Sequence, residues 1–223
     1  MNATSPKTGY ANRAIGAIAT SLPDSAALFR RHHIDFFCDA DDTLAEAAAA
    51  KGLSCAALET ELAAIADAAA TAPEQADNAL IEQIETRYHK VHRREVPELI
   101  KLARHVEATH KDHPAAPLGM ANLLEQILPE LESHMQKEEQ ILFPGIRQGA
   151  GSMLAGPVTV MMMEHEEHVV ALRKLKAIAH DFNAPDDACN SWRALYAGTQ
   201  KFADDFVEHM HTENNILFPR YLD

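Results

Sequence analysis

The sequence predicts an all-α protein, with a small helical domain followed by an antiparallel four-helix bundle. Alanine-rich runs such as residues 47–50 favour helices, and clusters of β-branched residues, which favour strands, are few. In the last two thirds of the chain, four long segments lie between helix-breaking sequences. The composition, 47% hydrophobic and 24% charged over 223 residues, is typical of a globular protein with a sizeable buried core.

Residues 1–66 are predicted to form the small helical domain. Ser21 and Pro23 are typical of the start of a helix, and we expect that helix to cover residues 26–33. The acidic segment 35–42 follows it and has no helical pattern, so it is predicted to be a turn.

Two further helices are predicted in this domain. Thr43 and Glu46 match a capping box in front of the alanine run, and Gly52 is expected to end the helix that they begin. Ser54 begins the next helix. Residues 67–77 are small and contain a proline, so they are predicted to be a linker.

Residues 78–223 are predicted to form the bundle. The four helices are expected to cover residues 78–110, 118–148, 157–183 and 186–218. Their length and the short loops between them indicate an up-down-up-down arrangement. Pro97 and Pro129 fall inside the first two helices, which we expect to be kinked or locally unwound there.

An internal repeat is the strongest feature of the sequence. Residues 134–144 and 209–219 are identical at seven of eleven positions. Each copy has a histidine followed four residues later by a glutamate, which places both side chains on one face of a helix. These pairs are His134 with Glu138 and His209 with Glu213. Both copies end in Ile-Leu-Phe-Pro, which is predicted to seal the end of the bundle and to stop the helix.

Two histidines on the other helices are expected at the same height. His89 lies near the start of the first long helix and His165 near the start of the third, and these starts adjoin the ends of the second and fourth helices. The predicted metal ligands are therefore His89, His134, Glu138, His165, His209 and Glu213. Imidazoles can hold the ends of a binuclear site while carboxylates bridge it. Donors of nitrogen and oxygen without thiolate favour iron first and manganese second.

Six of the remaining histidines fall into three groups. Height along the helices excludes His105, His110 and His180; His110, for instance, lies about 30 Å beyond His89. His92 and His168 are one turn from candidate ligands, either as partners of these ligands or as further ligands. His211 is expected to face away from the site. Four carboxylates either tune the site and provide an exit path or form a solvated acidic face: Glu130, Glu139, Glu164 and Glu166.

Charge and hydropathy exclude several classes of partner. The chain has 33 acidic and 20 basic residues, a net charge of −13, which disfavours nucleic acid. No apolar window reaches the roughly 18 residues that span a bilayer, and the N-terminus lacks a secretory signal, so we expect no membrane association and a cytoplasmic location. Cys38, Cys55 and Cys189 are widely spaced, which disfavours a disulfide framework or a thiolate zinc site.

With these motifs the chain resembles the hemerythrin-like iron–sulfur cluster repair di-iron proteins of the ScdA, NorA and DnrN type. The resemblance covers nearly the whole chain and includes residues 87–89 and 164–166, both repeat copies, and residues 26–31 in the small N-terminal domain. It implies a non-heme di-iron centre bridged by two carboxylates, with four histidines at its ends. It also implies a cytoplasmic role in nitrosative or oxidative stress.

One departure from the family pattern concerns the N-terminal domain. The family usually carries a Cys-Cys-Gly-Gly turn there, whereas this chain reads Phe37-Cys38-Asp39-Ala40. The vicinal thiol pair is missing, and with it the basis for a thiol relay or metal hand-over. Cys38 is then either a lone functional thiol or a partly buried cysteine of the turn.

Four functions remain open at this level. The first is repair of damaged iron–sulfur clusters, by supplying iron to the damaged proteins, by binding nitric oxide, or both. The second is a nitric-oxide buffer or sensor that donates no iron, which the missing thiol pair strengthens. The third is a di-iron oxidase or nitric-oxide reductase, which multiple-turnover gas reduction would reveal. The last is a helical interaction module, which would bind no stoichiometric metal.

Overall fold

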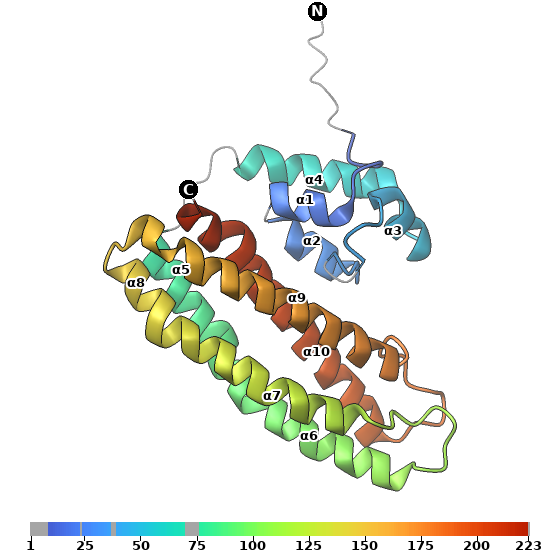
Figure 1. Ribbon diagram of the computed structural model, residues 1–223. Coiled ribbons are helices and arrows are strands. Elements are labelled where there is room, and N and C mark those ends of the chain that lie inside the picture. Colours follow the sequence, from blue (N-terminus) through green and yellow to red (C-terminus); the bar gives the residue numbers. More distant parts are fainter. Residues whose placement is uncertain (1–8, 23, 37–38, 70–75, 223) are drawn as a thin grey trace, which may run out of the picture. The chain divides into compact units, whose positions relative to one another are not determined.

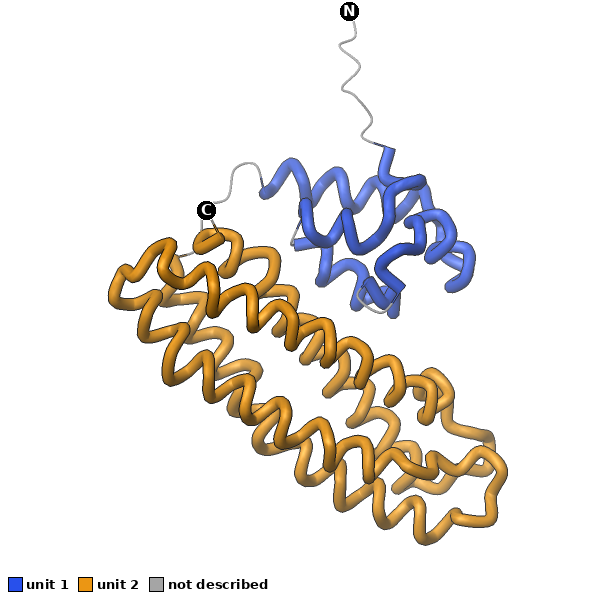
Figure 2. Tube along the Cα trace, viewed as in Figure 1, with its two compact units in different colours: residues 1–74 blue, residues 75–223 orange. Residues whose placement is uncertain are grey.

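The computed structural model describes residues 9–22, 24–36, 39–69 and 76–222. The chain divides into two compact units, residues 1–74 and 75–223 (Figure 2). Within the described residues all regular structure is helical, and an isolated bridge between Ala14 and Thr43 is the nearest approach to a strand. The predicted all-α fold is confirmed.

The described residues of the first unit form four helices. They are α1 Ile15–Ser21, α2 Ser25–Arg31, α3 Leu44–Ala50 and α4 Cys55–Ala69. Helix α1 was not predicted from the sequence. It has no capping side chain to mark its start, and burial of Ile15 and Ile18 stabilises it instead. The helix predicted over 26–33 is α2, and it ends earlier because His33 adopts a positive φ of 54°.

The predicted start and stop signals of α3 are confirmed. The Thr43 hydroxyl accepts a hydrogen bond from the Glu46 backbone N–H (3.2 Å), and the Glu46 carboxylate accepts one from the Thr43 N–H (2.9 Å). Gly52 has a φ of +66°, which ends the helix. Helix α4 continues to Ala69, so the first residues of the predicted linker are helical. Cys38 lies outside the described residues.

The second unit is a four-helix bundle. Its elements are α5 Asp77–Gln83, η1 Ile84–His89, α6 Lys90–Thr109, α7 Met120–Lys137, η2 Glu138–Leu142, α8 Phe143–Arg147, η3 Gly151–Leu154, α9 Ala155–Ile178, α10 Asn190–Thr212, η4 Glu213–Leu217 and η5 Phe218–Tyr221. Helix α6 packs on α7 and α10, and α9 packs on the same two helices. The four long helices thus form the up-and-down bundle that the sequence predicts (Figure 1).

The helices depart from regular α geometry at places that the sequence analysis did not expect. Helices α6 and α7 run without a break through Pro97 and Pro129, so neither helix is locally unwound there, and the alternative of a kink stays a prediction. The backbone carbonyls that the prolines leave without their helical partner belong to Arg93 and Glu125, and neither residue is buried. The irregular segments are instead three π turns, η1, η2 and η4.

The loop between α9 and α10 is longer than predicted, so both helices are shorter at this end of the bundle. Helix α9 ends at Ile178, before the predicted 183, because His180, Asp181 and Phe182 all have positive φ values of 50–60°. Helix α10 begins at Asn190, four residues after the predicted start.

Apolar side chains close one end of the bundle. The Leu-Phe pairs of the two repeat copies, Leu142 with Phe143 and Leu217 with Phe218, are buried in one cluster. This confirms most of the predicted seal, but Ile141 is 60% exposed and the chain continues as α8 after the first copy. At the same end Asp77 accepts hydrogen bonds from Arg220 and from the Tyr221 hydroxyl. Burial and then Asp77 raise the pKa of Tyr221 to about 12.

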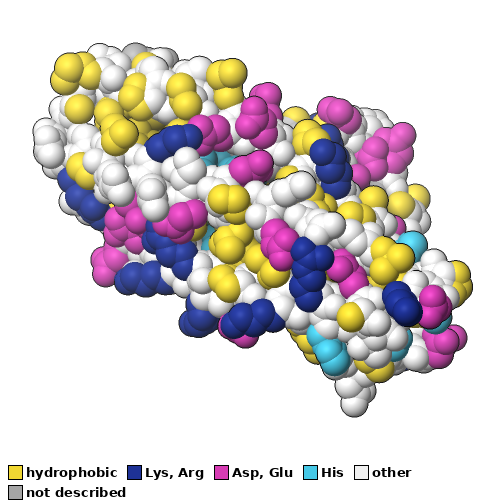
Figure 3. Space-filling model, turned by 60° about the horizontal axis from the view of Figure 1, so that its bottom comes forward, with side chains coloured by type: hydrophobic (Ala, Val, Ile, Leu, Met, Phe, Trp, Pro, Cys, Tyr) yellow, Lys and Arg dark blue, Asp and Glu magenta, His cyan; other side chains and the backbone are white. Residues whose placement is uncertain are grey.

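The surface carries charges of both signs. Acidic and basic side chains lie next to one another on the face in Figure 3, so the excess of acidic residues does not form a single patch there. Ion pairs on this unit include Arg104 with Glu125 and Arg147 with Glu85. In the described part of the chain, no helix is both long enough and apolar enough to cross a membrane.

Candidate metal centre

The structure brings the six candidate ligands together in two groups that share both glutamates. One group is His89, Glu138, His209 and Glu213, and the other is His134, Glu138, His165 and Glu213. Within each group the ligand atoms all lie within 4.8 Å of one another. All six side chains are at most 1% exposed, although four of them are polar rings and two are carboxylates.

Each glutamate directs one oxygen to each group. Oε2 of Glu138 lies 3.3 Å from Nε2 of His89, and its Oε1 lies 3.4 Å from Nε2 of His134. Glu213 repeats this arrangement, with its Oε1 3.0 Å from His209 and its Oε2 3.2 Å from His165. Two carboxylates that each face both groups are arranged as bridges between two metal positions.

The donor set fits two first-row metal ions. The Nε2 atoms of His89 and His209 are 3.1 Å apart, and those of His134 and His165 are 3.0 Å apart. A metal bound by imidazole at about 2.1 Å holds two neighbouring nitrogens about 3.0 Å apart when they are at right angles. Among the described residues no hydrogen bond satisfies either oxygen of Glu138 or Oε2 of Glu213. Such buried carboxylate oxygens are costly unless a cation pairs with them.

The π turns place three of the candidate ligands. His89 is the last residue of η1, and Glu138 and Glu213 are the first residues of η2 and η4. A π turn widens the helix by one residue and is frequent at functional sites. His165 lies instead inside the regular helix α9. In each repeat copy a new short helix with proline in its first turn follows the π turn, which fits a residue that lacks an N–H.

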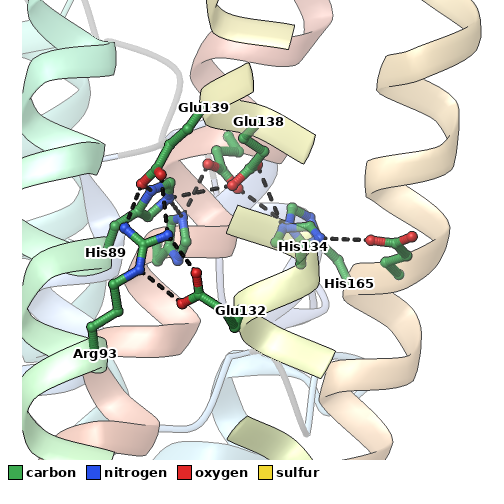
Figure 4. A network of polar contacts seen from close by, with 10 residues as sticks. His89, Arg93, Glu132, His134, Glu138, Glu139 and His165 are labelled. Carbon is green, nitrogen blue, oxygen red and sulfur yellow. Dashed lines mark hydrogen bonds and ion pairs between the residues drawn. The ribbon is translucent and has the colours of Figure 1, made fainter. Parts of the chain in front are cut away.

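Carboxylates that belong to ion pairs contact the Nδ1 atom of two of the histidines. His89 Nδ1 lies 2.7 Å from Glu139, which Arg93 also contacts through two hydrogen bonds; Arg93 in turn pairs with Glu132 (Figure 4). His134 Nδ1 lies 2.9 Å from Glu164, which also pairs with Lys137.

The other two histidines have different surroundings. His165 Nδ1 lies 2.8 Å from the side-chain oxygen of Asn214. His209 Nδ1 is buried without a hydrogen-bond partner among the described residues, and Tyr88 stacks on its ring with 5.2 Å between centroids. Such partners fix the orientation of a ligand imidazole and strengthen it as a donor.

Glu139 and Glu164 were predicted either to tune the site and provide an exit path or to form a solvated acidic face, and both contact candidate ligands, whereas Asn214 was not predicted. The repeat contains the signal for two of them, because Glu139 and Asn214 each follow the glutamate of the repeat. The other two acidic residues of the set, Glu130 and Glu166, are exposed.

Protons compensate the buried carboxylates when no cation does. Burial raises the pKa of Glu138 and Glu213, but the neighbouring imidazoles outweigh it and the net pKa of each is lowered. Burial lowers the pKa of His134, but Glu138, Glu213 and Glu164 together outweigh it and raise the pKa to about 9. Burial and the charge of His89 hold the pKa of His209 well below its usual value. Metal binding is therefore expected to release protons.

The remaining histidines lie outside both groups. His92 and His168 are buried one turn from His89 and His165, but neither belongs to a ligand group. His211 is buried and bonded to Asn215. His105 and His180 are exposed, and His110 contacts Trp192 and Cys189 in the region of the α9–α10 loop.

Comparison with known proteins identifies the family. Residues 80–221 match the hemerythrin HHE cation-binding domain, and residues 11–66 match the ScdA N-terminal domain, a domain of unknown function. The iron–sulfur cluster repair protein YtfE of Yersinia pseudotuberculosis is 44% identical over 96% of this chain and 98% of its own. The protein of the same name from Yersinia pestis is 43% identical over the same shares. The chain belongs to the hemerythrin-domain iron–sulfur cluster repair family.

Membership in the hemerythrin-domain repair family agrees with the chemistry of the site. The domain of this family is a cation-binding domain with a non-heme di-iron centre, and all six candidate ligands lie within its matched range. Because the matches to both domains leave only short stretches uncovered, the similarity extends over nearly the whole chain.

Proposed function

We propose that the site holds two iron ions. One ion would be bound by His89 and His209 and the other by His134 and His165, with Glu138 and Glu213 shared between the two ions. The observation that carries this assignment is the sharing of both glutamates between two otherwise separate groups. Each group provides two imidazoles and two carboxylate oxygens. Iron that prefers six ligands would keep positions open for a small exogenous molecule.

We propose further that this centre serves the repair of damaged iron–sulfur clusters, as the names of its relatives state for them. Bound iron supplies redox chemistry and the metal that a damaged cluster has lost. The protein residues orient the iron, keep it away from bulk water and exchange protons for metal at the histidines. Proteins with damaged clusters are then the targets, and nitric oxide is the small molecule that reaches the open positions.

A second candidate is a nitric-oxide buffer or sensor that donates no iron. It is favoured by the single Cys38 where the family usually has two neighbouring cysteines. A di-iron nitric-oxide reductase is the enzymatic form of the same chemistry, and it requires an electron donor.

The test uses protein loaded with ⁵⁷Fe and a hydratase whose [4Fe–4S] cluster has been damaged by nitric oxide. We expect about two irons per chain, recovery of hydratase activity, and ⁵⁷Fe in the restored cluster by Mössbauer spectroscopy. The variant with Glu138→Ala and Glu213→Ala should lose the iron and the repair, whereas Glu130→Ala, on an exposed position of α7, should keep both.

The outcomes separate the candidates. Nitric oxide binding without transfer of ⁵⁷Fe would favour the buffer, and repeated turnover of nitric oxide with an electron donor would favour the reductase. A wild-type protein that takes up no iron, even from ferrous salts, would refute all three and leave the helical interaction module.

We also propose a cytoplasmic location and a division into residues 1–66, a linker 67–77 and a di-iron domain 78–223. Both described cysteines, Cys55 and Cys189, are free thiols, which suits a reducing compartment. The matched domain ranges and the two compact units support the division.

A further inference from the structure

Two buried histidines beside the candidate metal centre have no assigned task. His92 is 1% exposed and His168 is 4% exposed, and the Nε2 atom of each lacks a hydrogen-bond partner among the described residues. A buried polar atom without a partner costs stability, so each one requires an explanation, such as a water or ligand that it binds.

The two histidines occupy equivalent places. His92 follows His89 by three residues on α6, and His168 follows His165 by three residues on α9. Because residues three apart share a helix face, each points to the same side as the candidate ligand before it. Each of the two ligand groups therefore has one additional imidazole.

The surroundings of the two rings are aromatic. The His92 ring lies 5.7 Å from the His209 ring and 5.5 Å from the Phe206 ring, measured between centroids. The His168 ring lies 5.1 Å from the His134 ring and 5.1 Å from the Phe206 ring. Phe206 thus contacts both histidines. Each histidine also lies against a candidate ligand on another helix, His92 against His209 on α10 and His168 against His134 on α7.

Their chemistry differs from that of the candidate ligands. In the described part of the chain no carboxylate forms an ion pair or hydrogen bond with Nε2 of either ring, whereas every candidate ligand histidine lies within 3.4 Å of a glutamate oxygen. A neutral imidazole has one N–H donor and one acceptor. It can therefore form a hydrogen bond with a small uncharged ligand, and the Nε2 atom of each ring has no other partner among the described residues.

We propose that His92 and His168 are hydrogen-bonding residues for a small uncharged ligand of the iron centre, nitric oxide, with one histidine beside each metal position. This inference rests on the proposed function, because it requires iron and nitric oxide at the centre. It adds to that function a polar contact that retains the ligand among aromatic side chains.

The test compares His92→Leu and His168→Leu with the wild-type protein, all loaded with iron and exposed to nitric oxide. Iron content, the nitric-oxide dissociation rate and the infrared N–O stretching frequency are measured in H₂O and D₂O. We expect two irons per chain in both variants, dissociation about tenfold faster, and loss of the D₂O shift that the wild type shows. A factor of ten corresponds to one hydrogen bond of ordinary strength.

Three further variants guard against indirect effects. His92→Gln and His168→Gln keep an N–H near the position of Nε2, so they should restore slow dissociation. His211→Leu removes a histidine that is equally buried and two residues from His209, but bonded to Asn215 and outside both groups. It should dissociate nitric oxide at the wild-type rate.

Three results would overturn the inference. Unchanged dissociation and an unchanged D₂O shift in both leucine variants would show that neither histidine contacts the ligand. Loss of iron in a leucine variant would make that histidine a metal ligand instead. An iron-loaded wild type that repairs clusters but binds no nitric oxide would refute the inference and leave the repair function intact, whereas failure to bind iron would refute both.

Discussion

At the scale of single residues, the two halves of the centre match in their candidate ligands and differ in what stands behind them. The residue after each shared glutamate contacts a histidine of a neighbouring helix: Glu139 contacts His89, and Asn214 contacts His165. The first partner is a carboxylate and the second an amide. Each ligand group also has one histidine with a carboxylate partner, because Glu164 contacts His134 in the second group. The two groups therefore differ at their other histidine: Asn214 contacts His165, whereas Nδ1 of His209 has no partner among the described residues.

Removal of the amide partner should weaken iron binding at one position. We expect Asn214→Ala to increase the rate of iron loss to a ferrous chelator by about tenfold, because an unsupported His165 loses its fixed orientation. Asn215→Ala is the matched control, since the neighbouring Asn215 bonds His211 in the same way but outside both groups. Equal rates in the two variants would contradict the role of Asn214.

The sequence predicted the candidate ligands better than their partners. The spacing of His134 and Glu138, repeated at His209 and Glu213, depends only on the helical period, and the structure brings these side chains together. The repeat places the partner Asn214 directly after Glu213, but its contact with His165 depends on how α9 packs against η4 and α10. Contacts between helices are set by tertiary structure, which spacing along one helix does not encode.

At the scale of elements, the π turns are the feature that the sequence could not reveal. A π turn uses the same residue types as an α-helix, and its extra residue is visible only in the hydrogen-bond ladder. Arg87 within η1 is fixed to α10 by two hydrogen bonds to Asp205, of 2.6 and 3.1 Å, and Lys201 also pairs with this carboxylate. This ion pair connects the π turn that carries His89 to the helix that carries His209.

Loss of this connection should destabilise the bundle. Burial raises the pKa of Asp205, but Arg87 and Lys201 outweigh it and the net pKa is lowered. The stabilisation is therefore present above the unfolded pKa of about 3.9 and is lost as pH falls through the folded pKa. We expect Asp205→Asn to lower the free energy of unfolding of the metal-free protein by about 1–3 kcal/mol at pH 7.

Urea unfolding at pH 7 and near pH 3 measures this effect. The difference between the variant and the wild type should shrink at the lower pH, where the wild-type carboxylate also begins to take up a proton. Glu98→Gln removes an exposed ion pair with Lys101 and should change the stability by less than about 1 kcal/mol at either pH. A difference for Asp205→Asn that is independent of pH would refute the electrostatic explanation.

At the scale of the whole molecule, the second unit contains everything that the proposed centre requires. All six candidate ligands and their partners lie between residues 76 and 222. A fragment of residues 75–223 should therefore fold and bind about two irons per chain, with the absorption spectrum of the full-length protein. Iron analysis and circular dichroism of the fragment test this. Folded helical protein without iron would show that the first unit takes part in holding the metal.

The contacts of Asp77 with Arg220 and Tyr221 have a consequence for the lifetime of the centre. Chain ends are normally the first parts of a domain to fray. The π turns η1 and η4, which carry His89 and Glu213, lie close in sequence to the two ends of this unit. Because hydrogen bonds join the two ends of the unit, neither end can unfold locally without breaking them, and the π turns nearest to the ends are protected from local opening.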